Sequence, residues 1–293
     1  MATTTPDNQP ASKSMFSVLV PAYNAGHTLS RTLDSLLAQT CDDWECIVVD
    51  DGSTDDTLVI AEKYSKKDVR FIVISQDNAG TGAALDRAAS VAQGIFLVQL
   101  GADDELLPEH CAKTAKFIES NPRYDIFAAN AWQEMPTGSK RLFNQGANFE
   151  DVTNVILEDL IRKPSIYGTA AVRRSVYESV GGFSSLSMHE DYDFWLKALL
   201  LGSKHIYQPE VLSVYHDSDT QKTSDPLKNR IADYELLSSL IGDKRLTARE
   251  YQALDSRLAE LQKNIAIRQR LYAILGRKFT EKIIAFARGN DGS

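Results

Sequence analysis

The sequence is poor in cysteine and has neither a long apolar run nor an excess of basic residues. Cys41, Cys46 and Cys111 are too few and too scattered for a disulfide framework or a zinc site, so we expect a reducing, cytoplasmic location. No apolar run reaches the length of a membrane span. Residues 1–14 are polar and lack the apolar core of a secretory signal, so we expect a disordered leader there. The net charge of −8 argues against a nucleic-acid ligand.

What is present is the composition of a globular protein with an uneven charge. Of the 293 residues, 43% are hydrophobic and 25% are charged, close to the averages for such proteins. Residues 227–293 hold 13 Lys and Arg against 8 Asp and Glu, a net charge of +5. The first 226 residues hold 19 Lys and Arg against 32 Asp and Glu, a net charge of −13. We therefore expect one domain over residues 15–226 and a basic, helical C-terminal extension over residues 227–293.

Apolar runs of strand length alternate with segments of helical periodicity in the first hundred residues. Strands joined by helices imply crossover connections and an α/β fold with a mostly parallel central sheet covered on both faces. The predicted strands cover residues 16–21, 45–49, 70–75 and 94–100, and the predicted helices cover 28–39, 57–65 and 82–93. Further strands are predicted over 125–131, 170–173 and 211–215, and helices over 151–162, 192–201 and from 227 onward.

Polar and aromatic clusters follow three of these strands, and ligands of such sheets bind at the carboxyl ends of the strands. Aspartates crowded after an apolar strand need compensation, and a hard divalent cation with substrate phosphates is the natural partner. The alternative is turn chemistry, with Asp104 capping a helix that begins near Leu106. The clusters are Pro21 to Asn24, Asp50 with Asp51, and Gly101 to Asp104.

Five motifs occur in order along the chain and together closely resemble the family 2 glycosyltransferases. The motifs are Val-Pro-Ala-Tyr-Asn (20–24), Val-Asp-Asp-Gly-Ser-Thr-Asp (49–55), Asn78 with Gly80, Ala-Asp-Asp-Glu-Leu-Leu-Pro (102–108) and His-Glu-Asp-Tyr-Asp-Phe-Trp-Leu (189–196). The resemblance covers roughly residues 15–220. It implies the three-layer nucleotide-diphosphosugar transferase fold called GT-A, and transfer of a sugar with inversion to an acceptor hydroxyl.

The resemblance assigns a donor site to the strand ends. The backbone at Pro21 and Ala22 and the ring of Tyr23 would hold the nucleotide base, and Asp50 or Asp51 would hydrogen-bond it. A packing role for the Tyr23 ring is the alternative. The remaining residues implied for donor binding are Asn78, Gly80, Ala102 and Asp104.

The resemblance also implies a metal ion and a catalytic base. Asp103 matches the last position of an Asp-x-Asp motif and would bind Mn²⁺ or Mg²⁺ at the diphosphate, with His216 completing that site or remaining an ordinary hydrogen-bonded histidine. Asp191 would remove the acceptor's proton, and Glu190 would position the acceptor. An N-cap role for Asp191 is compatible with catalysis.

Two departures from the family pattern keep a second function open. Gly101 stands where the family has the first Asp of Asp-x-Asp, and Leu85 with Asp86 stands where it often has Arg-Asn. The alternative function is therefore a non-catalytic module that binds a sugar nucleotide or a glycan. A sugar-phosphate nucleotidyltransferase would need a Gly-rich basic loop after the first strand, which Pro21 to Asn24 does not provide.

The C-terminal extension combines an apolar stripe with basic charge. Residues 263–288 are strongly basic, which is typical of a helix that lies on an anionic membrane. The alternative is packing on the domain or on a second copy of the chain. We expect a nucleotide-diphosphosugar donor, a UDP-sugar foremost, and a glycan or lipid-linked acceptor of cell-surface polysaccharide or glycolipid synthesis. The stripe consists of Leu258, Leu261, Ile265, Tyr272, Leu275, Phe279 and Phe286, with Arg268 and Lys282 interrupting it.

Overall fold

The computed structural model describes residues 14–143, 155–183, 186, 188–217, 225–277 and 280. Its first half follows the predicted alternation of strands and helices. The elements there are β1 (Phe16–Ala22), α1 (Leu29–Leu37), β2 (Trp44–Asp51), α2 (Thr57–Lys67), β3 (Phe71–Gln76), α3 (Thr81–Val91) and β4 (Phe96–Gln99).

The second half contains elements that the sequence patterns did not predict, among them α4 and α6. The elements are β5 (Glu105–Leu106), α4 (His110–Ser120), β6 (Ile126–Glu134), β7 (Lys140–Leu142), α5 (Leu157–Arg162), β8 (Ala171–Arg173), α6 (Arg174–Val180), α7 (Glu190–Leu200), β9 (His205–His216), α8 (Pro226–Ser238) and α9 (Ala248–Leu275). The capping role offered for Asp104 is wrong, because a strand follows it and the next helix begins at His110. Residues 151–154 of a predicted helix lie outside the described residues, as do residues 1–13 of the predicted leader.

One mixed sheet runs through the molecule in the order β3-β2-β1-β4-β8-β6-β9-β5, with β7 paired to β6. The strands β3, β2, β1 and β4 are mutually parallel. Antiparallel β8 then joins β4 to β6, and β9 runs parallel to β6. The parallel register places Ala22 opposite Asp50 and Asp51 opposite Gln76, so the carboxyl ends of β1, β2 and β3 meet at one edge.

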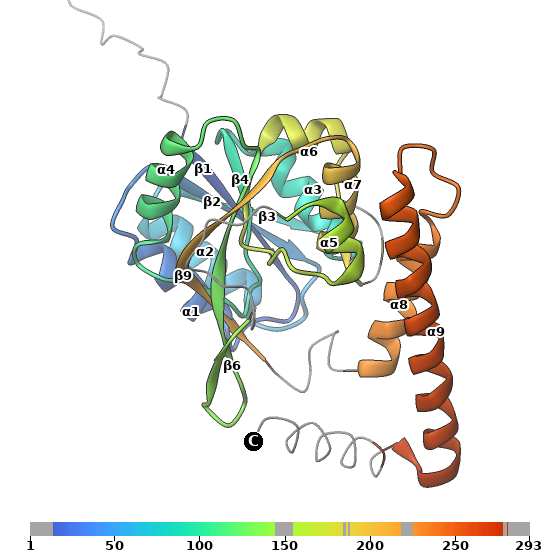
Figure 1. Ribbon diagram of the computed structural model, residues 1–293. Coiled ribbons are helices and arrows are strands. Elements are labelled where there is room, and N and C mark those ends of the chain that lie inside the picture. The colour runs from blue at the N-terminus through green and yellow to red at the C-terminus, as the bar shows by residue number, and fades with distance from the viewer. Residues whose placement is uncertain are drawn as a thin grey trace, which may run out of the picture.

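Alternation along the strands divides the core into two layers, one on each face of the sheet. Phe16, Val18 and Val20 of β1 pack with α1, α2 and α4, whereas Leu19 packs with α3, α5, α6 and α7. Figure 1 shows helices on both sides of the sheet. The predicted three-layer α/β architecture is confirmed.

The C-terminal helices α8 and α9 extend the second of these layers. Asp225 caps α8 by accepting from Leu227 N at 3.1 Å, and Pro226 occupies the first turn, where its missing N–H costs nothing. The two helices bury apolar side chains in the same cluster as α5 and α7. Their buried residues in that cluster are Leu236, Leu237, Ala253, Leu254, Leu258 and Leu261.

The far half of α9 is exposed. It continues past α8 and stands apart from the α/β body (Figure 1). Ile267 is 45% exposed and Ile274 is 77% exposed, while Arg268 is buried and donates from Nε to the Tyr272 hydroxyl at 3.2 Å. The predicted stripe is therefore buried at Leu258 and Leu261, half-buried at Ile265 and Tyr272, and exposed at Leu275. Phe279 and Phe286 lie outside the described residues.

Replacing Leu237 by alanine should lower the free energy of unfolding of the whole chain by about 2–5 kcal/mol, because this fully buried α8 side chain belongs to the shared core. Denaturant unfolding should show one transition, moved to lower denaturant. The matched control is Ile241→Ala, just past α8, where the side chain is 64% exposed and a change within about 0.5 kcal/mol is expected. Separate unfolding of α8 and α9 at a lower denaturant concentration than the rest of the chain would contradict a shared core.

Candidate active site

The loop after β1 is tied to the loop after β2. Asn24 has a φ of +50°, and its side-chain oxygen accepts from Thr54 N at 2.8 Å. Between this tie and the strand, Tyr23 is 55% exposed, so the packing role offered for its ring is wrong. Pro21 is half-buried and Ala22 is buried, and the ring of Tyr23 thus projects from a fixed backbone.

The carboxylate of Asp51 holds the loop that leads into α3. Its Oδ1 accepts from Gln76 Nε2 at 2.8 Å and from Ala79 N at 2.9 Å, and its Oδ2 accepts from Gly80 N at 2.9 Å. The Asn78 side chain donates to the Asp51 carbonyl at 2.9 Å. An anion at the N-terminus of a helix also interacts favourably with the helix dipole. Both oxygens of Asp51 are therefore engaged by the protein itself.

Asp50 is buried beside Asp51 and has weaker partners. Ser75 Oγ donates to its Oδ2 at 3.2 Å, and Ser53 N lies 3.4 Å from its Oδ1. The following Gly52 has a φ of +73°, and a Cβ there would meet Asn78 N at 2.8 Å. Glycine at position 52 is thus required for the loop after β2 to contact the loop after β3. Of the two aspartates, Asp50 makes the longer hydrogen bonds.

The turn after β4 brings two carboxylates together. A Cβ at Gly101 would lie 2.8 Å from Asp103 Oδ1 and 2.9 Å from Asp104 Oδ2, so glycine makes room for both. Asp104 is buried and accepts from Tyr167 Oη at 2.8 Å and from His216 N at 3.0 Å. Burial and the neighbouring charge of Asp103 raise the pKa of Asp104 to about 8. The ionised form of Asp104 is therefore disfavoured beside Asp103, and a cation at the turn would stabilise it.

Around this turn lie charged residues that the sequence patterns did not assign. His216 Nε2 lies 2.6 Å from Glu105 Oε1, and its Nδ1 lies 4.0 Å from Glu134. Arg31 of α1 lies 3.3 Å from Glu105 and donates to the Asp103 carbonyl at 2.7 Å. Glu105 belongs to the quoted motif, whereas no local signal marks Arg31 or Glu134, because only the fold brings them here.

The residues of this turn have the donor atoms that a hard cation prefers, but they are not arranged as a complete coordination site. Within the described residues, no three His, Cys, Asp or Glu side chains are grouped so as to hold a metal ion. The carboxylates of Asp103 and Asp104 are oxygen donors that Mg²⁺ and Mn²⁺ prefer. The Nε2 of His216 is turned to Glu105.

The first turn of α7 carries the predicted base. His189 is the N-cap, so the N-cap role offered for Asp191 is wrong. Glu190 and Asp191 occupy the first turn, and Asp191 Oδ1 accepts from Tyr192 N at 2.7 Å. Burial raises the pKa of Asp191 above its ordinary value.

Asp191 and the last residue of β4, Gln99, both lie close to Gly168. A Cβ placed on Gly168 would be 3.9 Å from Asp191 Oδ2 and 4.0 Å from Gln99 Oε1. The Oε1 atom of Gln99 is buried without a hydrogen-bond partner among the described residues. Gln99, the last residue of β4, is a further member of the site that its sequence position did not mark.

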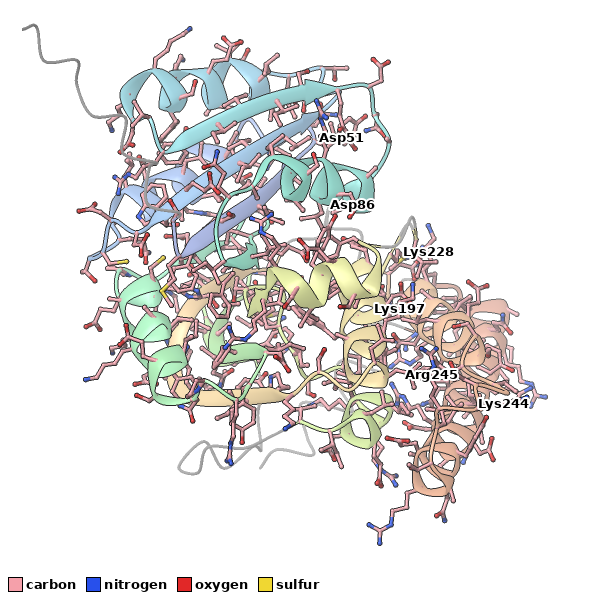
Figure 2. All side chains as sticks on the ribbon, turned by 90° about the horizontal axis from the view of Figure 1, so that it is seen from above. Asp51, Asp86, Lys197, Lys228, Lys244 and Arg245 are labelled. Atoms are coloured by element: carbon pink, nitrogen blue, oxygen red, sulfur yellow. The ribbon has the colours of Figure 1, made fainter. Side chains whose placement is uncertain are left out.

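The departure at Leu85 and Asp86 has a structural explanation. Leu85 is fully buried, and Asp86 Oδ1 accepts from Phe183 N and from the Tyr177 hydroxyl, each at 2.8 Å. A Cβ at Gly182 would meet the same oxygen at 2.8 Å. Figure 2 shows Asp51 at the strand ends and Asp86 on α3. Asp86 thus holds the turn between α6 and α7.

Comparison with known proteins decides the family. The model of the family described as "Glycosyl transferase family 2" matches residues 17–181. The chain belongs to glycosyl transferase family 2. A PGL/p-HBAD biosynthesis glycosyltransferase of Mycobacterium bovis is 30% identical to this transferase over 244 residues, covering 80% of this chain and 87% of that protein.

Solved structures share the fold of this transferase. The crystal structure of S. aureus TarS 1-349 superposes with a TM-score of 0.69 at 23% identity, covering 89% of this chain and 75% of that one. Its complex with UDP-GlcNAc gives 0.67 at 24%, covering 88% and 73%. Mannosyltransferase PcManGT from Pyrobaculum calidifontis, in complex with GDP-Man and Mn²⁺, gives 0.66 at 19%, covering 95% and 81%. The predicted GT-A fold is confirmed.

Replacing Asp51 by alanine should destabilise the transferase by about 1–3 kcal/mol, because the N–H groups of Ala79 and Gly80 lose their acceptor. Donor binding should weaken as well, since the loop after β3 loses its anchor. Denaturant unfolding and nucleotide titration measure the two effects. The control is Asp77→Ala, an exposed carboxylate in the same loop, for which both quantities should stay unchanged.

Proposed function

We propose that this transferase moves a sugar from a nucleotide-diphosphosugar to an acceptor hydroxyl with inversion at the sugar carbon. The observation that carries this proposal is the placement of Asp191. It stands in the first turn of α7 and, like Gln99 at the end of β4, lies close to Gly168; the aspartate turn at Asp103 follows that same strand. The proposed base on α7 and the proposed site of the leaving diphosphate after β4 therefore lie in neighbouring parts of the molecule.

The chemistry is a single displacement. The acceptor oxygen forms a bond to the sugar carbon while the bond to the diphosphate oxygen breaks and its electron pair leaves with the nucleoside diphosphate. The acceptor's proton goes to the carboxylate of Asp191, which acts as general base. Glu190, next to it in the same turn, positions the acceptor. One displacement requires no covalent enzyme intermediate.

The donor lies across the edge of the sheet in this proposal. The base stacks on the exposed ring of Tyr23 and hydrogen-bonds to Asp50, whose weaker partners leave it freer than Asp51. Because β1 lies between β2 and β4, Asp50 and the β4 turn are about 10 Å apart. Pro21, Ala22, Asn78 and Gly80 shape the first part of the site, and Ala102 and Asp104 shape the second.

A divalent cation fits the turn after β4. Asp103 would hold it, with His216 once that ring leaves Glu105; Asp104 supports the turn through Tyr167 and His216. When bound, Mn²⁺ or Mg²⁺ supplies a Lewis acid for the charge that develops on the leaving diphosphate. The Mn²⁺ in the PcManGT complex supports this assignment.

The neighbours also support a choice of substrates. TarS is seen with UDP-GlcNAc and PcManGT with GDP-Man, and we propose a UDP-sugar as donor. The Mycobacterium bovis relative is named for PGL/p-HBAD biosynthesis. We propose an acceptor of cell-surface polysaccharide or glycolipid synthesis, glycan or lipid-linked.

A screen of UDP- and GDP-sugars with Mn²⁺, Mg²⁺ or EDTA, scored by release of nucleoside diphosphate, tests the proposal. We expect turnover with one or a few donors and its loss in EDTA. Asp191→Asn should lower kcat by about 10²–10⁴-fold while donor binding persists. Donor binding without turnover would indicate the non-catalytic alternative, and a fully active Asp191→Asn would overturn the mechanism.

The pH profile gives a second test of the base. Only the deprotonated carboxylate accepts a proton, so the rate should rise with pH through the pKa of Asp191. Because burial raises that pKa, the acid limb should lie at higher pH than for an ordinary carboxyl group. The residual activity of Asp191→Asn should lack this limb.

We also propose that the exposed half of α9 contacts an anionic membrane surface, and that this surface is the cytoplasmic face of the membrane. The exposed basic residues of the stretch 262–277 are Lys263, Arg270 and Arg277, and the stretch has no acidic residue. Arg277 also lies 3.1 Å from Asp225. Exposed Ile267 and Ile274 lie among these charges. In the described residues, no helix is long and apolar enough to cross a membrane. A second copy of the chain is the alternative partner.

Flotation with vesicles containing anionic lipid tests this contact in the full chain. Lys263→Glu with Arg270→Glu should weaken binding at least about tenfold, since each basic residue near the surface contributes about 1 kcal/mol. Both side chains are exposed, so stability should not change. Equal flotation of the variant and the unmodified chain would contradict the proposal. So would a dimer that the two substitutions disrupt, if the chain does not bind vesicles.

A further inference from the structure

The N-cap of α7 has an unusual backbone. His189 has a φ of +63°, and it shares positive φ with Asn24 alone among the non-glycine residues that the structure describes. The left-handed conformation is unfavourable for a residue with a Cβ and persists where the surroundings enforce it. The next two residues are Glu190 and Asp191, so the conformation of His189 sets the direction of the turn that carries the proposed base.

Helix α8 supplies a charged partner of His189, and α9 supports that partner. Asp233 of α8 places Oδ1 3.0 Å from His189 Nδ1, as a charge contact without the alignment of a hydrogen bond. Arg257 of α9 lies 3.6 Å from the other oxygen of Asp233 and 2.9 Å from Glu260. The side chains of His189, Asp233 and Arg257 are only 14–17% exposed. Little solvent therefore screens this network.

The charge of His189 agrees with this arrangement. Burial alone would lower its pKa, but Asp233, Asp191 and Glu190 outweigh burial and raise it. The imidazolium is thus stabilised between the proposed catalytic turn and α8. Arg257 on the far side of Asp233 balances the carboxylates.

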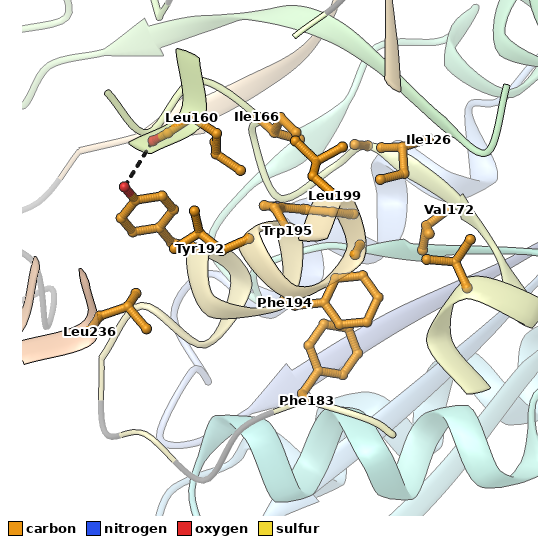
Figure 3. Close-up of a cluster of buried hydrophobic side chains, with 14 of the residues drawn as sticks. Ile126, Leu160, Ile166, Val172, Phe183, Tyr192, Phe194, Trp195, Leu199 and Leu236 are labelled. Carbon is orange, nitrogen blue, oxygen red and sulfur yellow. Dashed lines mark hydrogen bonds between the residues drawn. The ribbon is translucent and has the colours of Figure 1, made fainter. Parts of the chain in front are cut away.

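Apolar packing holds the same junction rigid. Leu236 of α8 and Tyr192 of α7 belong to one buried cluster, and both are drawn in Figure 3. The hydroxyl of Tyr192 donates to the Leu160 carbonyl at 2.9 Å, which joins α7 to α5 (Figure 3). Asp233 is therefore presented from a packed helix and not from a mobile surface arm.

From these contacts we infer that the C-terminal helices are part of the catalytic apparatus: Asp233, supported by Arg257, holds His189 in its left-handed conformation and thereby fixes the first turn of α7. Asp233 and His189 are positioning residues, and Asp191 is the group on which they act. The inference rests on the proposed role of Asp191. It gives the extension a function in the reaction, separate from any contact with a membrane.

Four variants of the full chain isolate this effect. Asp233→Ala removes the partner, and His189→Ala removes the side chain while keeping a Cβ. His189→Asn restores a residue that tolerates the left-handed region and can donate to Asp233. Asp243→Ala is the control, because it breaks the ion pair with Arg245 in the same extension and leaves Asp233 and Arg257 in place.

The first readout needs no substrate. The Asp193 amide donates to the His189 carbonyl at 2.9 Å in the first turn of α7. Hydrogen exchange at residues 191–193 should accelerate about tenfold or more in Asp233→Ala and in His189→Ala, and should be near wild type in His189→Asn and Asp243→Ala. Unchanged exchange in Asp233→Ala would overturn the inference.

The second readout is steady-state kinetics with the donor found by the screen. Asp233→Ala and His189→Ala should each lower kcat about tenfold, with KM for the donor within about twofold. The double variant should be no worse than either single one, because both break the same contact. Multiplicative losses, or a lower melting temperature with kcat unchanged in the folded protein, would contradict positioning.

The two proposals fail in different ways. If Asp191→Asn keeps full activity, the base assignment falls, and the hydrogen-exchange result still decides whether Asp233 fixes the turn. If Asp191→Asn is inactive but Asp233→Ala keeps wild-type exchange and kcat, the base stands and the positioning role falls.

Discussion

The parallel pairing of β1 with β2 and β4 is the constraint on which the rest of the structure depends. It brings the carboxyl ends of these strands to one edge, where three loops must share little space. Each loop leaves backbone N–H groups that need acceptors, and buried carboxylates supply them. Asp51 does so for the loop before α3, and Asp104 does so for the end of β9.

The acidic residues of the edge therefore divide into two kinds. The first kind accepts hydrogen bonds from backbone N–H groups and hydroxyls and so fixes the shape of the site; its members are Asp51, Asp86 and Asp104. Asp191 keeps Oδ2 beside Gly168, and Asp103 points an oxygen into the space that Gly101 leaves open. The engaged carboxylates hold loops, whereas Asp191 and Asp103 are the ones proposed to act on the acceptor and to hold the cation. Glycine at position 101 belongs to this arrangement, since a side chain there would push the two carboxylates of the turn apart.

The C-terminal helices change what counts as the domain. They share a core with α5 and α7, and through Asp233 they touch the residue before the proposed catalytic turn. The family match ends at residue 181, so α7 and both helices lie beyond it. The part of the chain that the family match covers supplies the edge of the sheet, and the later part carries Asp191, the proposed base. The exposed half of α9 remains available for a partner without disturbing that junction.

The sequence by itself determined the alternation of strands and helices in the first half, because period-2 and helical patterns are local. It also placed Tyr23, the aspartate pairs and Glu190 with Asp191 at element ends, because motifs are local too. Only the tertiary structure decided which aspartates are engaged, that His216 faces Glu105, that Arg31 and Gln99 lie near the predicted site residues, and that Asp233 contacts His189. Short elements such as β5 and α6 also escaped prediction, since their few residues carry no clear period. The physical reason is sequence separation: Asp104 and His216 stand 112 positions apart, and no local pattern encodes a contact that the whole sheet must form first.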